Sequence, residues 1–310
     1  MREPAPAGRV AVIGAGTIGA SWAAYFLSRG LPVTAWDPRP DAERFARRFI
    51  AEAWPALSRL GLAAGADPER VTFAKDARTA VADAGFVQES GPEREDLKIE
   101  LFRTLDGAAA PEIVIASSSS GLLMSRIQEG CGHPERCVIG HPFNPPHLIP
   151  LVEVVGGQKT APEAIARALA FYAQIGKEPI HVRKEVKGHI ANRLQAALWR
   201  EAVHLLADGV ASVADIDKAI AFGPGLRWAF MGPNTTFHLA GGEGGMAHFL
   251  EHLGTPMESW WADLGAPRLT PAIRTRIVDG VAEAVGGRGI SELAAERDRR
   301  LLAILAALAR

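Results

Sequence analysis

The sequence predicts an α/β protein in two parts, a doubly wound, mostly parallel sheet followed by an all-α domain. Two observations predict it. Short apolar stretches alternate with amphipathic stretches as far as residue 186, a pattern typical of parallel strands joined by crossover helices. From Gly188 onward helical periodicity continues without a convincing strand. We therefore expect one domain over residues 1–186 and a helical domain over 187–310.

A glycine-rich turn follows the first expected strand, which covers residues 9–14 (RVAVIG). A helical pattern over 21–29 comes next, and a second strand over 31–36. In such a unit the glycines allow a tight turn and let the backbone approach a pyrophosphate, which the helix N-terminus binds through free N–H groups. The turn therefore predicts a Rossmann-type dinucleotide site made by Gly14, Gly16, Thr17, Ile18 and Gly19.

The acid that closes the second strand indicates which dinucleotide binds. Asp37 lies 18 residues after Gly19, where a carboxylate accepts hydrogen bonds from the ribose hydroxyls and repels a 2′-phosphate. This favours NAD over NADP. Arg39 weakens the argument, because an arginine there can pair with a phosphate.

The remaining elements follow from the same periodicities. Strands are expected over 71–74, 86–89, 113–117, 151–155 and 180–182, and helices over 41–60, 93–105, 162–175, 190–208, 213–222, 235–253, 271–285 and 290–309. Polar residues come at several strand ends, namely Glu89, Ser117–Ser120 and His141. Because ligands bind at the carboxyl ends of parallel strands, we expect these residues to share one edge of the sheet.

A histidine and a glutamate stand out near that edge. His141 opens a polar island that ends at Asn144, and Glu153 interrupts the apolar run 151–155. A buried carboxylate needs a partner, and an imidazole suits it, because a bond to one ring nitrogen leaves the other free as a base near neutral pH. The alternative is a capped turn followed by a strand with one charge at its edge. Most of the other histidines are expected at the surface or in packing, while His181 and His189 border the expected domain junction and His238 is a candidate for the cleft.

Composition excludes several other classes of protein. The net charge is −1 and no long basic block occurs, which argues against nucleic-acid binding. No apolar run approaches the roughly 20 residues that a membrane helix needs. Cys131 and Cys137 have no clustered histidines near them in the sequence, so we expect free thiols, a cytoplasmic protein and no metal site.

Five separated motifs, in this order and at these intervals, resemble the L-3-hydroxyacyl-CoA dehydrogenase superfamily. They are GAGTIG with Asp37, the serine run, HPFNP, LVEVV and GHIANR. The resemblance implies NAD as cofactor and His141 with Glu153 as the catalytic pair. It also implies that Ser120 touches the substrate oxygen with Asn192, that Lys98 and Glu93 lie near the cofactor, and that Asn144 shapes the loop holding the histidine.

The chain departs from the acyl-CoA members of that superfamily in two places. Residues 41–76 contain one lysine, Lys75, where those enzymes have a lysine-rich helical pair that docks CoA, and the closing K-T-G-x-G-F-Y segment is missing. The stretches EAWPAL, QESGPE, HVRKEV, GPGLRWAFMGP and TFHLAGGEGGMAHF are instead similar to the L-carnitine dehydrogenase branch. L-gulonate 3-dehydrogenase, related to lambda-crystallin, is a near neighbour of that branch.

This branch implies a small 3-hydroxy acid that carries a quaternary ammonium. Aromatic faces hold such a cation at roughly 0.5–2 kcal/mol each. Trp228 and Phe230, flanked by glycines in an expected irregular loop, are the candidates for that contact. Arg193, Ser117 and Ser119 are candidates for the substrate carboxylate, and Asn144 for a further contact.

Two other readings stay open. The first is a short-chain hydroxyacyl-CoA or sugar-acid dehydrogenase. The second is an NAD-binding protein without useful turnover, like the related lens crystallins. In every case we expect the helical domain to form a homodimer through its apolar faces.

Overall fold

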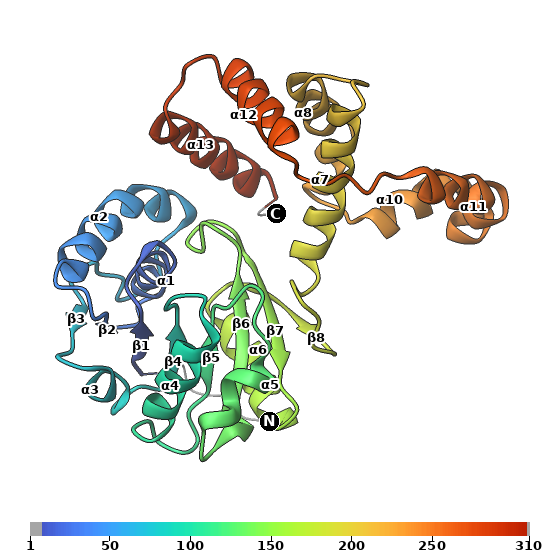
Figure 1. Ribbon diagram of the computed structural model, residues 1–310. Helices are drawn as coiled ribbons and strands as arrows, with labels where there is room; N and C mark the ends of the chain where they lie inside the picture. The colour runs from blue at the N-terminus through green and yellow to red at the C-terminus, as the bar shows by residue number, and fades with distance from the viewer. Residues whose placement is uncertain (1–7, 309–310) are drawn as a thin grey trace. The chain divides into compact units, whose positions relative to one another are not determined.

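The structure, a computed structural model, describes residues 8–308 of the chain. The chain forms two compact units, which divide between Arg193 and Leu194 (Figure 1). The first unit is built on a sheet and the second is helical. The expected fold class is therefore confirmed.

The first unit contains one eight-stranded sheet with the strand order β3-β2-β1-β4-β5-β6-β7-β8. The strands are β1 Val10–Ile13, β2 Val33–Trp36, β3 Val71–Phe73, β4 Phe86–Glu89, β5 Ile115–Ser117, β6 Cys137–Pro142, β7 Leu151–Gly156 and β8 Glu178–Val182. All neighbouring pairs are parallel except β6 and β7, which run antiparallel. Strands β1, β4, β5 and β6 are buried along their whole length, as expected of strands covered on both faces.

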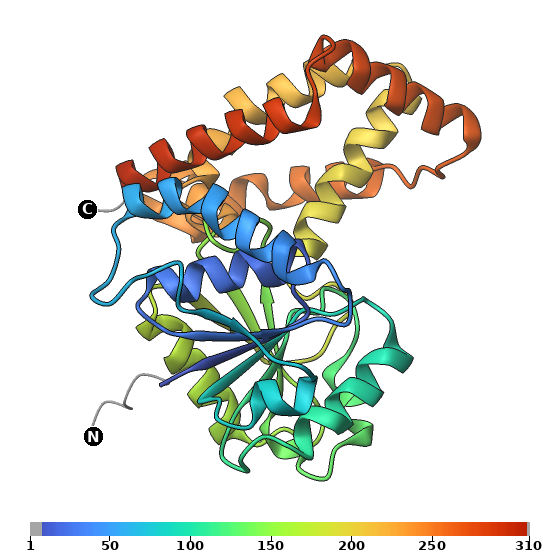
Figure 2. The ribbon, with the colours of Figure 1, turned by 90° about the vertical axis from the view of Figure 1, so that its left-hand side faces the viewer.

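Helices cover both faces of this sheet, as Figure 2 shows for α1 and α4. They are α1 Thr17–Ser28, α2 Ala42–Leu60, α3 Ala77–Val81, α4 Glu95–Asp106, α5 Met124–Ile127 and α6 Pro162–Gln174, with short 3₁₀ turns at Gln128–Gly130 and Pro134–Arg136. One apolar core contains Trp22 of α1 and Tyr172 of α6. A second core contains Phe102 of α4 and Met124 of α5. The sheet lies between the two cores, and the polar ends of β4 and β5, Glu89 and Ser117, are paired at one edge of it.

The second unit is entirely helical among its described residues. Helix α7 Ala191–Ala207 enters it from the first unit, and α8 Val213–Phe222, α9 Pro224–Trp228, α10 Pro233–Ala240, α11 Gly245–Asp263, α12 Pro271–Val285 and α13 Ile290–Leu308 follow. Helices α8 and α12 contain no buried residue, so this unit leaves much apolar surface uncovered within the described chain. No helix among residues 8–308 is both long and apolar enough to cross a bilayer.

The structure corrects the expected helix over 235–253, which is broken in two. Helix α10 ends at Ala240, and α11 begins at Gly245. Gly245 has φ 58°, a left-handed conformation that favours glycine, and a Cβ there would come within 2.4 Å of the ring of His238. Helix α11 then continues to Asp263 through Pro256, where the sequence Gly-Thr-Pro suggests a stop. The cluster of glycines at 241–245 therefore ends the first helix.

Three smaller expectations also need correction. Trp228 does not lie in an irregular loop, because it ends the short helix α9, which begins with a proline at its first position. The short helices α3 and α5 are not predicted by the sequence pattern, since four or five residues are too few to show a period of 3.6. Strand β6 is missing from the expected strands, although His141 is expected at a strand end, and it pairs with β7 in the antiparallel direction.

Candidate active site

A buried imidazole–carboxylate pair lies on the β6–β7 hairpin. The antiparallel register places His141 directly opposite Glu153. Nδ1 of His141 lies 2.8 Å from Oε2 of Glu153, and both side chains are buried. A carboxylate only accepts hydrogen bonds, so Nδ1 carries the hydrogen and Nε2 keeps a free lone pair. The contact that the sequence predicts is present, and it leaves one ring nitrogen able to take a proton.

The other oxygen of Glu153 binds the beginning of helix α7. Oε1 accepts hydrogen bonds from the backbone N–H groups of Ile190 and Ala191, each at 2.9 Å. Burial alone would raise the pKa of Glu153, but the hydrogen bonds from His141 and from these two N–H groups outweigh burial and hold the pKa below its usual value. Glu153 is therefore charged at neutral pH and can stabilise a protonated His141.

The glycine-rich turn between β1 and α1 has the geometry that a dinucleotide needs. A Cβ on Gly19 would lie 1.8 Å from the carbonyl oxygen of Gly14, so the helix approaches the turn closely. A Cβ on Gly16 would meet nothing within 4 Å, which leaves open space beside the turn. Helix α1, which starts with Thr17 and Ile18, has no side-chain cap and no acid in its first turn. Its N–H groups are thus available to a pyrophosphate, and the turn fits NAD.

Asp37 follows β2 and is already hydrogen-bonded within the chain. Its carboxylate accepts hydrogen bonds from the backbone N–H of Ala15 at 2.8 Å and from Nε of Arg39 at 3.0 Å. Burial alone would raise the pKa of Asp37. The hydrogen bonds from Arg39 and Ala15 lower it by more, so the pKa lies below its ordinary value. The carboxylate is charged and lies beside the glycine-rich turn, as binding of a ribose would require.

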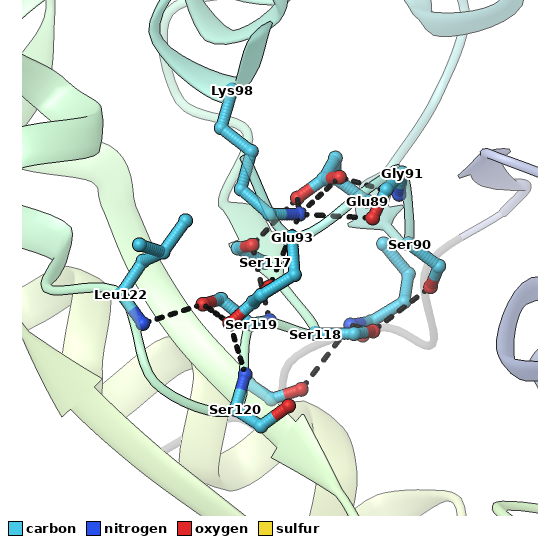
Figure 3. A network of polar contacts seen from close by, with 12 residues as sticks. Glu89, Ser90, Gly91, Glu93, Lys98, Ser117, Ser118, Ser119, Ser120 and Leu122 are labelled. Atoms are coloured by element: carbon cyan, nitrogen blue, oxygen red, sulfur yellow. Dashed lines mark hydrogen bonds and ion pairs between the residues drawn. The ribbon is translucent and has the colours of Figure 1, made fainter. Parts of the chain in front are cut away.

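A network of polar side chains occupies the ends of β4 and β5 (Figure 3). Nζ of Lys98 donates to both oxygens of Glu89 at 2.7 and 2.9 Å, and Oγ of Ser117 donates to the same carboxylate at 2.5 Å. Lys98 is 1% exposed and Glu89 is fully buried. The two opposite charges therefore compensate each other at this edge of the sheet.

The carboxylate of Glu93 organises the serine turn of the same network. It accepts hydrogen bonds from Oγ of Ser119 at 2.7 Å and from the backbone N–H of Ser120 at 3.0 Å and of Gly121 at 2.9 Å. Burial raises the pKa of Glu93, but these bonds and the charge of Lys98 hold it below its usual value. Ser120 itself is exposed, so its hydroxyl is the one in this turn that is most open to a ligand.

The other expected site residues come from other elements of the chain. Asn192 and Arg193 lie in the first turn of α7, where Asn192 is partly buried and Arg193 is exposed. Asn144 is exposed after β6. Trp228 and Phe230 belong to the second unit, where they are 41% and 61% exposed. Among the described residues one group of possible metal ligands occurs, His248, Glu251 and His252, all exposed on α11, and the expectation of no metal remains a prediction.

Two residues of the site are missing from the sequence-based candidates. Glu89 is predicted only as a strand end, although a carboxylate as the last residue of a buried strand is a signal for a polar network. His189 is buried, and its Nε2 lies 3.1 Å from the carbonyl oxygen of Ser119. Its ring centre is 5.2 Å from that of His141. The motif GHIANR contains His189, but no sequence spacing connects it with the serine turn.

Family comparisons cover both parts of the chain. Residues 9–186 match the family described as 3-hydroxyacyl-CoA dehydrogenase, NAD binding domain. Residues 188–267 match 3-hydroxyacyl-CoA dehydrogenase, C-terminal domain.

Individual proteins are similar over nearly the whole chain. An L-carnitine dehydrogenase of Streptomyces coelicolor is 55% identical over 310 residues, which is 100% of this chain and 98% of that protein. An L-carnitine dehydrogenase of Pseudomonas sp. is 53% identical over 298 residues, 96% of this chain and 93% of that protein.

Two solved structures show the same arrangement of elements. The 5-dehydrogenase of 5-formyl-3-hydroxy-2-methylpyridine 4-carboxylic acid, an NAD⁺-dependent dismutase, has a TM-score of 0.84 at 32% identity and covers 97% of this chain and 98% of its own. The (S)-3-hydroxybutyryl-CoA dehydrogenase of Ralstonia eutropha has a TM-score of 0.65 at 25% identity, with 92% and 96% covered.

Proposed function

The chain belongs to the 3-hydroxyacyl-CoA dehydrogenase family, and from this we propose that it oxidises the 3-hydroxyl group of L-carnitine to the ketone, 3-dehydrocarnitine, with NAD. The observation that carries the reaction type is the buried contact between His141 and Glu153. The similarity to L-carnitine dehydrogenases over nearly the whole chain supports the choice of substrate.

The catalytic step requires a proton acceptor at the C3 hydroxyl and a hydride acceptor at C3 itself. NAD supplies the hydride acceptor when it is bound at the glycine-rich turn. Nε2 of His141 takes the proton of the C3 hydroxyl, and the charged Glu153 stabilises the imidazolium that results. Ser120 and Asn192 orient the substrate oxygen in this proposal. The products are the ketone, NADH and one proton.

Lys98 and Glu93 support the part of the site near the cofactor, and they do so through the serine turn. Nζ of Lys98 donates to Glu89 and to the carbonyl oxygen of Gly91, so the lysine contributes a positive charge from a fixed, buried position. Glu93 holds the turn that presents Ser120. Both residues would keep the serine turn in place beside the bound nicotinamide.

The substrate needs contacts for a carboxylate and for a trimethylammonium group. Ser117 and Ser119 donate their hydroxyls to Glu89 and Glu93, so they have only lone pairs left to offer, which do not suit a carboxylate. Arg193 is exposed and charged, and it is our preferred partner for the carboxylate, with Asn144 as a further contact. The exposed rings of Trp228 and Phe230 are preferred for the trimethylammonium group.

A substrate panel with NAD tests this function. Formation of NADH is measured with L-carnitine, L-gulonate and 3-hydroxybutyryl-CoA at equal concentrations. We expect turnover of L-carnitine and little with the other two. Turnover of the CoA ester or of gulonate in place of carnitine would move the assignment to those substrates, and NAD binding without any turnover would contradict an enzymatic role.

Replacing Asp37 with Ala is expected to weaken NAD binding by about 10–100-fold, the value of hydrogen bonds to a charged group. NADP binding should change less, because Arg39 loses its partner and can pair with a 2′-phosphate. The ratio of the two dissociation constants is the measurement, since a general loss of folding would affect both equally. Asp41→Ala, four residues on and exposed, is the matched control. An unchanged ratio in Asp37→Ala would contradict the role of Asp37.

Three further assignments belong to this proposal. We place the domain division at residues 186–187, which the two family matches support, although the compact units divide at 193–194. A homodimer through the helical domain is supported by its exposed apolar side chains, such as Phe222 at 77% and Ile290 at 83%. The free thiols of Cys131 and Cys137 support a cytoplasmic location. Light scattering of the purified protein tests the dimer, and a monomeric mass would contradict it.

A further inference from the structure

His189 occupies an unusual backbone position at the edge of the site. It follows Gly188 and precedes helix α7, and it has φ 49°. Among residues 8–308 it is the one non-glycine residue in the left-handed region. Such a conformation costs of order 1–3 kcal/mol and persists only where the surroundings determine it. The fold therefore retains a histidine where glycine would be easier to accommodate.

The two ring nitrogens of His189 have different surroundings. Nε2 lies 3.1 Å from the carbonyl oxygen of Ser119, and since a carbonyl only accepts, Nε2 carries the hydrogen and donates it. Burial lowers the pKa of the imidazole, although the bond to Ser119 partly opposes the shift, so the ring is neutral. Nδ1 then has a bare lone pair. It is buried and has no hydrogen-bond partner within the described chain.

A buried acceptor without a partner is costly, typically about 1–3 kcal/mol. Two other buried side-chain nitrogens lack a partner among the described residues, Nε1 of Trp22 and Nε of Arg29, but both are N–H donors in the region of helix α1. The lone pair of His189 instead lies in a ring centred 5.2 Å from that of His141. An unpaired acceptor beside a proton-accepting histidine is best explained by a donor that arrives with a ligand.

The segment 189–191 connects three parts of the site. The side chain of His189 holds the carbonyl of Ser119, in the turn that presents Ser120. The backbone N–H groups of Ile190 and Ala191 donate to Glu153, whose other oxygen accepts a hydrogen bond from His141. A change in the His189 ring therefore reaches both the serine turn and the catalytic pair.

We propose that His189 is a ligand-binding residue of this site, whose Nε2 anchors the serine turn while its Nδ1 accepts a hydrogen bond from the bound ligand. This inference rests on the proposed dehydrogenase function. The donor is an O–H or N–H group. The single hydroxyl proton of the substrate goes to His141 in the proposed reaction, so the donor that the reaction leaves for His189 is the carboxamide of the nicotinamide. Neither His189 role needs the ring to become charged.

Three substitutions separate the two nitrogens. His189→Gln places an amide N–H near the position of Nε2 and removes the Nδ1 acceptor. His189→Asn places its amide near Nδ1, removes the bond to Ser119, and tolerates a positive φ. His189→Phe keeps a ring and removes both. His181→Gln, at an exposed histidine of β8, is the matched control.

The measurements are the melting temperature, the dissociation constant of NAD, and KM and kcat for L-carnitine. We expect His189→Phe to lower the melting temperature by roughly 2–4 °C and His189→Gln to restore it. We expect His189→Gln nevertheless to weaken ligand binding by about 3–10-fold, the value of one neutral hydrogen bond, and His189→Asn to recover part of that loss. A weaker NAD constant in His189→Gln is the expected result, and an effect on KM alone would contradict the carboxamide as the donor.

Wild-type ligand binding and turnover in His189→Gln would overturn the proposal, because Nδ1 would then have no role. The same conclusion follows if all three variants keep the wild-type NAD constant and KM. Failure of the proposed function is a separate result, since it would appear as absent carnitine oxidation in the unsubstituted protein. In that case the NAD constants and melting temperatures of the three variants still test His189.

Discussion

Replacing His141 with Gln is expected to lower kcat by about 10²–10⁴-fold, the usual contribution of a positioned general base. Glutamine has a similar length and can still donate to Glu153, but its amide cannot take a proton near neutral pH. The NAD contacts in our proposal are made mainly at the glycine-rich turn and Asp37, so the dissociation constant of NAD should stay within about twofold of the wild-type value. Single-turnover formation of NADH and a separate NAD titration are the measurements.

The control for this substitution is His133→Gln. His133 is exposed and also contacts a carboxylate, that of Glu135, but it lies outside the site. We expect its turnover to match that of the unsubstituted protein. Wild-type turnover in His141→Gln would exclude this histidine as the base, whereas parallel losses of turnover and NAD affinity would indicate a folding defect instead.

Replacing Glu153 with Gln is expected to give the second large effect, roughly 10²-fold on kcat, because the protonated imidazole loses its counter-charge. The same change weakens the bonds to the N–H groups of Ile190 and Ala191. Hydrogen bonds to a charged group contribute about 1.5–3 kcal/mol, so the free energy of unfolding should fall by a similar amount at neutral pH. Urea unfolding at pH 7 measures this loss.

The pH dependence of that loss has a definite sign. The pKa of Glu153 is lowered in the folded protein relative to its ordinary value of 4.5. Its contribution to stability is therefore fully present above the unfolded pKa and is lost as the pH falls through the folded pKa. We expect the difference in unfolding free energy between the wild type and Glu153→Gln to shrink below about pH 4.5. A difference that stays constant with pH would contradict this account.

An exposed carboxylate provides the control for the stability measurement. Glu163→Gln removes a charge from the first turn of α6, where the side chain is exposed. Surface substitutions of this kind usually change stability by no more than about 0.5 kcal/mol. A loss of unfolding free energy as large as that of Glu153→Gln would show that neutralising any carboxylate has this effect and that the hydrogen bonds of Glu153 are not its cause.

The sequence predicts well those features that depend on short stretches of chain. The strand, glycine turn and acid of the dinucleotide site lie within residues 9–37, and their spacing alone defines the unit. The contact between His141 and Glu153 can also be predicted, because a charge inside an apolar run has few possible partners. The catalytic roles of both residues remain predictions.

Other features depend on contacts that no local pattern records. The bond from His189 to Ser119 joins residues 70 positions apart, and the pair of Glu89 with Lys98 depends on how α4 packs over β4. The break at Gly245 depends on the ring of His238, which excludes a side chain there. The reversal of β7 relative to β6 is invisible in the sequence, because a buried strand is apolar in either direction.

The hydrogen bonds that orient Glu153 determine which amino acids members of the family can have at positions 190 and 191. Its second oxygen accepts hydrogen bonds from the main-chain N–H groups at positions 190 and 191, and every amino acid other than proline has a main-chain N–H group. Natural variants and designed libraries can thus exchange the side chains at these two places while the acid keeps its orientation. Proline at either position removes one of the two donors, and it is the substitution we expect selection to reject there.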